Sequence, residues 1–266
     1  MGKITTNLSK MASRLEDEVH YYLHHDEQYL DMNALIGKDM EIVFEGIINC
    51  VVCGKKTNKS FGQGACYPCF INAPETSPCI INPELCEAHL GKGRDVEWEN
   101  AHHNQPHVVY LAKSSSIKVG VTRNTQIPTR WIDQGASEAI ILAEVPYRQL
   151  AGAIEVELKD YFTDKTNWQR MLKNDLSPLD LLAAKEEVLQ AYLSEEFHEF
   201  VSDKDEIISI NYPVKNYPSK VKSINLDKEA IIESKLEGIK GQYLYFSDGK
   251  VFNVRNHSGY LVSLNY

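Results

Sequence analysis

The stretch CVVCGKKTNKSFGQGACYPC, residues 50–69, decides the local fold of this chain more than any other segment. Its cysteines form a C-x2-C-x12-C-x2-C array, with members Cys50, Cys53, Cys66 and Cys69. Two such pairs supply the four thiolates that a tetrahedral structural zinc requires. Gly54 and Pro68 suit the turns, because glycine permits unusual backbone angles and proline fixes one. The array therefore predicts a bound zinc. Two disulfides are the alternative, and they require an oxidising compartment.

Length and composition predict a protein of the cytoplasm. The chain has 266 residues, which suggests about two domains. Its hydrophobic content of 43% is ordinary for a globular protein. Residues 1–14 are polar and lack the apolar centre of a signal peptide, and no run approaches the roughly 18 apolar residues of a membrane span. We therefore expect a cytoplasmic protein with no membrane partner, in which six cysteines favour metal over disulfides.

Charge is unevenly distributed along the chain. The formal net charge of -9 argues against a general nucleic-acid coat, and residues 11–50 are strongly acidic. Residues 107–132 reverse the pattern, with no acid and four bases: Lys113, Lys118, Arg123 and Arg130. This basic segment could hold the phosphate backbone of DNA or RNA against an otherwise acidic molecule. A solvated surface is the alternative.

The pattern of apolar residues predicts helices and strands along the whole chain. We expect a helix before Gly37 and a strand over 39–50 that enters the zinc knuckle. Next come a hairpin of strands 108–112 and 117–122, a helix over 125–134, a strand over 139–145 and a helix from Pro146. Another helix opens at Ser177. The strands expected at 239–246, 251–255 and 260–264 could pair with 39–49 into a small sheet or barrel, so that both chain ends form one body.

The middle segment carries a second constellation of residues. The stretch "VVYLA…IKVGVT…R…IE…N", between about Pro106 and Arg170, resembles the GIY-YIG nuclease superfamily. The resemblance implies a β-hairpin/helix/strand/helix domain that cleaves phosphodiesters with a divalent metal. It matches the catalytic positions of that family to Tyr110, Lys118, Arg130, Glu155 and Asn167, with Gly120 as the glycine of the second strand. Lys118 stands where the family has its second tyrosine, which puts catalysis in doubt.

The chemistry of such a site is coherent. Cleavage needs a metal, an activated nucleophile and a cation for the developing charge. Glu155 could hold Mg²⁺, Arg130 could bind the phosphate, and Tyr110 or Lys118 would assist the nucleophile. Each residue also has a structural alternative. Tyr110 could be a core aromatic, Arg130 could pair with Asp133 on its own helix, and Asn167 could cap a turn.

Further cysteines and histidines follow the zinc array. Cys79, Cys86, His103 and His107 could hold a second zinc of mixed sulfur and nitrogen ligands. Buried free cysteines are the alternative. In the C-terminal part, residues 214–222 interleave lysines with Tyr217 and contain no acid, which suits single-stranded nucleic acid, although a solvated loop before a β domain is the favoured alternative.

A resemblance also extends over most of the chain. The stretches "PELCEAH", "RDVEW", "QPHVVYLA" and "KVGVTR…QIPTRWIDQGA" resemble an uncharacterised prokaryotic zinc-cysteine family, the DUF2797-like proteins. Together these features predict an α+β protein with a four-cysteine zinc knuckle, a central GIY-YIG-like domain and a C-terminal β region. Its segments are an N-terminal helix and strand at 1–46, a zinc-binding region at 47–105, the GIY-YIG-like domain at 106–172, a helical segment at 173–205 and β structure at 206–266.

The predicted function follows from these parts. We expect a zinc protein that engages nucleic acid through its central domain, either as a Mg²⁺-dependent endonuclease or as an inactive module that binds nucleic acid or a protein partner.

Overall fold

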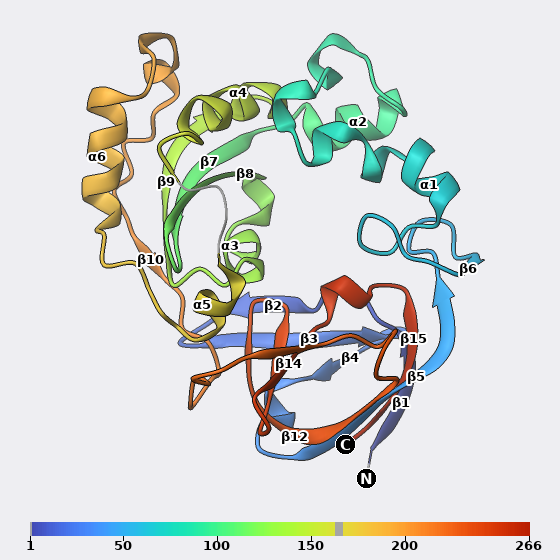
Figure 1. The fold of residues 1–266 in the computed structure, drawn as a ribbon. Helices are drawn as coiled ribbons and strands as arrows, with labels where there is room; N and C mark the ends of the chain where they lie inside the picture. Colours follow the sequence, from blue (N-terminus) through green and yellow to red (C-terminus); the bar gives the residue numbers. More distant parts are fainter. Residues whose placement is uncertain (1, 163–166) are drawn as a thin grey trace. The chain divides into compact units, whose positions relative to one another are not determined.

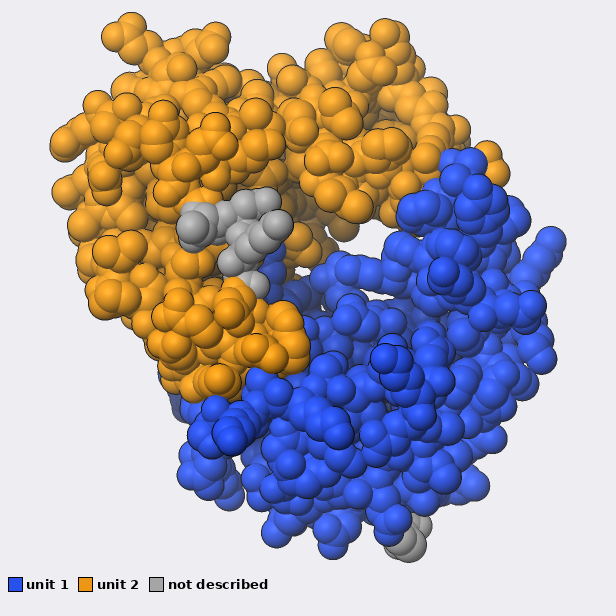
Figure 2. Space-filling model, in the orientation of Figure 1, with its two compact units in different colours: residues 1–71, 132–134, 211–266 blue, residues 72–131, 135–210 orange. Residues whose placement is uncertain are grey.

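A computed structural model describes residues 2–162 and 167–266 (Figure 1). The chain divides into two compact units (Figure 2). Unit 1 comprises residues 1–71, 132–134 and 211–266, and unit 2 comprises residues 72–131 and 135–210. Both ends of the chain therefore belong to unit 1, as the expected pairing of the terminal strands requires.

Unit 1 is built on an eight-stranded sheet whose longest strand is β5 (Asp39–Asn49). This strand pairs antiparallel with β12 (Ile231–Lys240) on one side and with β15 (Tyr260–Asn265) on the other. The prediction that C-terminal strands pair with residues 39–49 is thus confirmed. The remaining members are β1 (Lys3–Asn7), β6 (Lys56–Thr57), β11 (Lys222–Ile224), β13 (Tyr243–Phe246) and β14 (Lys250–Asn253). The single strand expected over 239–246 is two strands, because the chain turns at Gly241, whose φ is 62°.

The helix expected before Gly37 is wrong. That region forms β1 and then a three-stranded sheet of β2 (Ala12–Leu15), β3 (Val19–His25) and β4 (Gln28–Asp31), followed by a 3-10 turn at Asn33–Leu35. The reason is visible in β3, where Val19, Tyr21 and Leu23 are buried and alternate with more exposed residues. A period of two residues buries one face of a strand, and it cannot bury one face of a helix.

Unit 2 contains a four-stranded sheet in the order β10-β9-β7-β8. The predicted hairpin is confirmed as β7 (His107–Lys113) and β8 (Ile117–Arg123), which pair antiparallel along their whole length. β9 (Glu138–Val145) pairs with the other edge of β7, and the short β10 (Ile208–Ser209) pairs with β9. In the core of the unit, Val109 and Leu111 of β7 pack with apolar side chains of two helices, α4 (Arg148–Leu158) and α6 (Leu181–Ala191).

The helices around this sheet are shorter than predicted. The helix expected from Thr125 is a 3-10 turn at Asn124–Gln126 followed by α3 (Thr129–Asp133), and Gly135 with φ 70° lies just beyond it. α4 (Arg148–Leu158) lies within the helix expected from Pro146 and buries Ile154 and Leu158. α6 (Leu181–Ala191) begins after Asp180, whose side chain accepts a hydrogen bond from the Ala183 amide.

Shorter helical segments complete the described structure. α1 (Tyr67–Asn72) follows the cysteine array, α2 (Val96–His103) precedes β7, and α5 (Trp168–Leu172) precedes α6. Turns of 3-10 helix lie at Pro74–Thr76, Pro78–Ile80, Pro83–Leu85, Ala88–Leu90, Glu195–Phe200 and Arg255–His257. Within the described ranges, no helix has the length and apolar character needed to cross a membrane.

Candidate functional site

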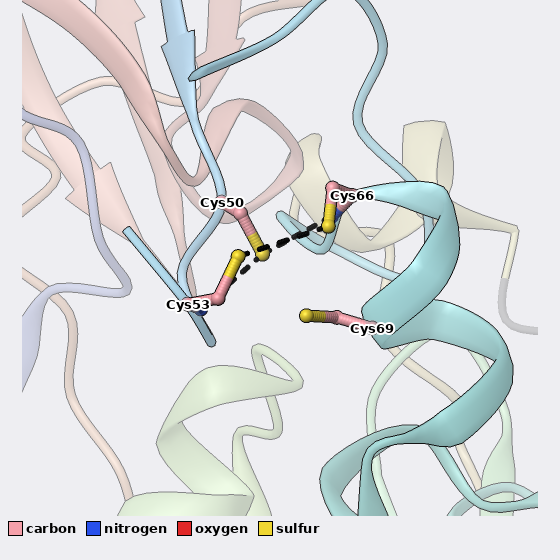
Figure 3. Close-up of side chains that lie close together, drawn as sticks. All are labelled: Cys50, Cys53, Cys66 and Cys69. Atoms are coloured by element: carbon pink, nitrogen blue, oxygen red, sulfur yellow. Dashed lines mark hydrogen bonds between the residues drawn. The ribbon is translucent and has the colours of Figure 1, made fainter. Parts of the chain in front are cut away.

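The four-cysteine cluster of unit 1 forms where β5 leaves the sheet. Cys50 follows the last residue of β5, and the chain turns through Cys53 and Gly54 before returning as β6. Cys66 precedes α1, and Cys69 lies within its first turn. Figure 3 shows the four side chains directed toward one common point. A hairpin turn and a helix N-terminus therefore each contribute one Cys-x2-Cys pair, as the spacing predicted.

The distances within this cluster suit a metal and exclude a disulfide. The four sulfur atoms lie within 4.8 Å of one another, and the Sγ atoms of Cys53 and Cys66 are 3.8 Å apart. Zinc–sulfur bonds of about 2.3 Å at a tetrahedral angle place two sulfurs about 3.8 Å apart. A disulfide requires about 2.05 Å. All six cysteines are free thiols in the structure, and this cluster could hold a metal such as zinc.

Backbone amides prepare the cluster for negative charge. The Cys50 sulfur accepts hydrogen bonds from the amides of Cys66 at 3.1 Å and Cys53 at 3.5 Å. Burial raises the pKa of Cys50, but these amides outweigh burial and lower its pKa to about 6. The side-chain hydrogen bond with Cys66, followed by burial, raises the pKa of Cys69 to about 12. A bound metal ion would stabilise the thiolate form of all four cysteines, because metal ions bind cysteine as the deprotonated thiolate.

A second group of possible metal ligands lies in unit 2. It consists of Cys79, Cys86, Glu99 and His103, all buried, with ligand atoms within 4.8 Å of one another. Glu99 and His103 are spaced i, i+4 on α2 and so share one face of that helix. Cys79 lies in one 3-10 turn, and Cys86 directly follows the next. Like the first cluster, this group could hold a metal such as zinc.

The spacing of its atoms is that of a coordination sphere. The His103 Nδ1 atom lies 3.6 Å from the Cys86 sulfur and 3.8 Å from the Cys79 sulfur. The Glu99 Oε2 atom lies 3.9 Å from the Cys79 sulfur and 3.3 Å from His103 Nδ1. In a tetrahedral zinc site, bond lengths of about 2.3 Å to sulfur and 2.1 Å to nitrogen or oxygen give edges of about 3.6 Å and 3.4 Å.

Surrounding groups hold these ligands in place. The other carboxylate oxygen of Glu99, Oε1, accepts a hydrogen bond from the Arg94 amide at 3.1 Å. Arg148, at the start of α4, donates from Nε and Nη2 to the Cys79 carbonyl at 3.1 and 2.9 Å, and from Nη2 to the Ile80 carbonyl at 3.0 Å. Outer contacts of this kind orient first-sphere ligands.

His107 lies outside this second group, so the structure places Glu99 where the sequence suggested His107. The His107 Nδ1 atom lies 2.7 Å from the Gln105 carbonyl oxygen, and burial lowers the pKa of the ring to about 4. Its Nε2 atom is buried and has no hydrogen-bond partner within residues 2–162 and 167–266. The signal that could have found Glu99 is its Glu-x3-His spacing to His103, which puts both side chains on one face of a helix. Arg148 carried no comparable sequence signal.

Tyr110 is a core residue in the structure. Its side chain is fully buried, and its ring packs edge-to-face against Trp131 with centroids 5.9 Å apart. A Cβ atom at Gly120 would lie 2.7 Å from the Tyr110 hydroxyl, so glycine is required opposite this tyrosine. The register pairs Tyr110 with Gly120 and Ala112 with Lys118. Alternation along each strand then puts Tyr110 and the half-buried Lys118 on the same face of the sheet.

Arg130, Glu155 and Arg148 are electrostatically connected. Burial lowers the pKa of Arg148, the charges of Cys79, Cys86 and Glu155 raise it, and Arg130 lowers it. Arg130 of α3 and Glu155 of α4 are both partly exposed. Asp133 was the expected ion-pair partner of Arg130. In the structure its carboxylate instead accepts hydrogen bonds from Lys10 at 2.7 Å and from Gln242 at 2.9 Å.

Asn167 has a local structural role. Its side-chain oxygen accepts hydrogen bonds from the amides of Gln169 and Arg170 at 3.1 and 3.2 Å and so caps α5. The residue itself is exposed. This is the capping alternative that the sequence left open for this residue.

Comparison with known proteins gives a family without an activity. No curated protein and no solved structure matches the chain significantly. A family model described as "Protein of unknown function (DUF2797)" matches residues 37–262, which include both cysteine clusters and the sheet of unit 2. Because this match covers most of the chain, the protein belongs to the DUF2797 family.

Proposed function

We propose that this chain is a zinc-organised protein that engages nucleic acid through the hairpin, helix, strand and helix of unit 2, which resemble the GIY-YIG nuclease superfamily. The observation that carries the proposal is the arrangement of charged residues on those elements. Arg130 on α3 and Glu155 on α4 both lie close enough to Arg148 to shift its pKa, although they are far apart in sequence. Phosphodiester binding with a divalent metal uses a cation for the phosphate and a carboxylate for the metal, and the surroundings of Arg148 supply both kinds of group.

Two arginines are available for phosphate. Arg123 and Arg130 are partly exposed, and neither side chain forms an ion pair or hydrogen bond within the part of the chain that the structure describes. An unpaired guanidinium at the surface can bind a phosphate through two parallel hydrogen bonds. Because residues 107–132 contain no acid, nothing on this segment opposes the approach of an anion.

Hydrolysis would assign a role to each residue. Glu155 would bind Mg²⁺ through oxygen, and Arg130 would bind the scissile phosphate. A water molecule, losing a proton to Lys118 as the neutral amine or to Tyr110 as the phenolate, would attack phosphorus, and one ester oxygen would leave and take up that proton. Lys118 is the better candidate for proton transfer, because the Tyr110 side chain is fully buried.

The second candidate function is binding without cleavage, to nucleic acid or to a protein partner. Two observations favour it over hydrolysis. The family's second tyrosine is replaced by Lys118, and Tyr110 is packed into the core against Trp131. Both candidates use the same arginines, so they differ in the role of Glu155.

Cleavage assays separate these candidates. The full chain is incubated with plasmid, structured DNA and RNA in Mg²⁺ or Mn²⁺, beside Glu155→Ala. Cleavage by the wild type that disappears in Glu155→Ala supports the nuclease. No cleavage by the wild type, or equal cleavage by both proteins, removes it.

Binding assays test the shared part of the proposal. We expect the affinity of the wild type for nucleic acid to fall with salt, and Arg130→Ala to weaken binding and flatten that salt dependence by about one phosphate contact. Arg170→Ala is the matched control, because Arg170 lies in the same unit and is paired with Asp175 at 2.6 Å. Equal affinity of Arg130→Ala and wild type would contradict nucleic-acid binding at this site. If the wild type binds no nucleic acid at all, the remaining candidate is a protein partner.

A further inference from the structure

We propose that Cys79, Cys86, Glu99 and His103 bind a second zinc ion, and that this ion braces α4 of unit 2 through Arg148. The inference is independent of nucleic-acid binding, since it concerns the metal content and the packing of unit 2. It replaces His107 of the sequence prediction with Glu99 as the fourth ligand.

Geometry is the first support. The four measured separations between ligand atoms run from 3.3 to 3.9 Å, and the shortest joins nitrogen to oxygen while the longer ones involve sulfur. That order follows the bond lengths of zinc, which are about 2.1 Å to nitrogen and oxygen and about 2.3 Å to sulfur. Four side chains from α2 and two turns thus point to one position, and their ligand atoms keep the separations that a shared metal ion would impose.

Charge is the second support. Glu99 is 3% exposed, and its carboxylate lies 3.9 Å from the Cys79 sulfur and within 4.8 Å of the Cys86 sulfur, so an ionised carboxylate there costs free energy unless a cation offsets it. Zinc with two thiolates, one carboxylate and a neutral histidine carries a net charge of about -1. The half-buried guanidinium of Arg148 lies against the Cys79 carbonyl and supplies the balancing positive charge.

The competing explanation is a metal-free hydrogen-bond network. In it, the Cys79 thiol would donate to Glu99, and His103 would pair with Glu99 as an imidazolium. The Ser77 hydroxyl, 3.0 Å from the Cys79 sulfur, would belong to the same network. This network predicts no bound metal, so metal stoichiometry decides between the two.

The brace on α4 follows from two contacts. Arg148 in its first turn donates three hydrogen bonds to the carbonyls of Cys79 and Ile80, one of which belongs to a ligand. One turn later, Gly152 lies directly against the backbone of Pro83 and Glu84, between the two cysteines in sequence. A metal that fixes Cys79 and Cys86 therefore fixes the surface on which the helix carrying Glu155 rests.

Zinc content of the full chain, purified anaerobically with reductant and measured by elemental mass spectrometry, tests the proposal. We expect two zinc ions per wild-type chain and one in each of Cys86→Ser and Glu99→Gln. Cys69→Ser should lose the other ion, and His107→Asn should keep both. Two ions in Glu99→Gln and Cys86→Ser, or one ion in His107→Asn, would overturn the ligand set.

Cobalt titration of the wild type covers the case in which a variant fails to fold. After chelation, Co²⁺ should bind in two equivalents, and the thiolate charge-transfer absorbance of the two steps should differ about twofold, as four thiolates differ from two. Saturation at one equivalent would refute the second site. Hydrogen exchange tests the brace, with faster exchange over 148–158 expected in Cys86→Ser and unchanged exchange there in Cys69→Ser. Unchanged exchange over 148–158 in Cys86→Ser would refute it.

Discussion

Gly152→Ala should open the contact between α4 and the cysteine turns of unit 2. A Cβ atom at this position would lie 2.2 Å from the Glu84 amide nitrogen and 2.4 Å from the Pro83 carbonyl carbon. These are backbone atoms, so no side-chain rotation relieves the clash. Ordinary contact begins near 3.4 Å, and the helix must therefore withdraw by about 1.2 Å.

That displacement is enough to break the hydrogen bonds of Arg148. Its Nη2 atom lies 2.9 Å from the Cys79 carbonyl oxygen, and a withdrawal of about 1.2 Å stretches the contact to about 4.1 Å, beyond hydrogen-bond range. Overpacking of a well-packed contact costs about 1–3 kcal/mol, and the lost bonds of Arg148 together cost about 1.5–3 kcal/mol, the value of a single bond to a charged donor, because water can replace the other partners of this half-buried guanidinium. Alanine returns about 1 kcal/mol through helix propensity. We expect a net loss of about 3 kcal/mol.

Urea unfolding of the full chain, with zinc retention against a competing chelator, measures this effect. Ala153→Gly on the same helix is the control, because it costs about 1 kcal/mol in helix propensity without a clash. Gly152→Ala should therefore be the less stable variant and should release one zinc at lower chelator concentration. A Gly152→Ala protein as stable as the wild type, with the same zinc retention, would refute both the close contact and its coupling to the metal.

Three further predictions concern other parts of the chain. Burial lowers the pKa of Lys240 to about 8. Above pH 8 the unfolded chain therefore keeps a proton on Lys240 that the folded chain has lost. The free energy of unfolding should then rise by about 2 kcal/mol from pH 8 to 9.5. Lys240→Met should abolish that rise in urea titrations and increase stability below pH 8, and a persistent slope would point to another group. Asn167→Ala should destabilise the protein by about 1 kcal/mol by thermal melting, because α5 loses its cap, while Asn167→Asp keeps it; equal losses in both would contradict capping. Chelation of all metal should make the cysteine thiols reactive toward a thiol reagent, with Cys53 labelled first because it is the exposed member of its cluster. Equal labelling rates with and without the chelator would argue against bound metal.

The elements that the sequence predicted well are those with strong local signals. The hairpin at 107–123 and the strand at 39–49 follow from unbroken alternation or apolar runs bounded by turn residues. The four-cysteine cluster follows from spacing alone, because each Cys-x2-Cys pair needs only one turn to present both sulfurs. Longer-range features had no such signal. The contact of Arg148 with the Cys79 carbonyl joins residues far apart in the chain and could only come from the structure.

The N-terminal region shows how a secondary-structure prediction from local sequence can fail. A helix was expected before Gly37, yet Glu16, Asp17 and Glu18 lie in the bend between β2 and β3. The deciding pattern was the alternation of Val19, Tyr21 and Leu23, which is short and is diluted by histidine and tyrosine at the intervening positions. Since these apolar side chains are almost fully buried, tertiary packing overrides the composition of the segment.

The second cluster shows the same limit at the level of a site. The sequence prediction included His107 because it lies four residues after His103, a spacing that suits two ligands of one metal. Helix geometry decides otherwise, since α2 carries Glu99 and His103 one turn apart on one face, whereas His107 begins the next strand. A carboxylate is a harder, more exchangeable ligand for zinc than thiolate or imidazole. The ion of unit 2 should therefore leave more readily than that of the four-cysteine cluster, and the order of zinc release during chelator titration of wild type and Cys86→Ser would show whether it does.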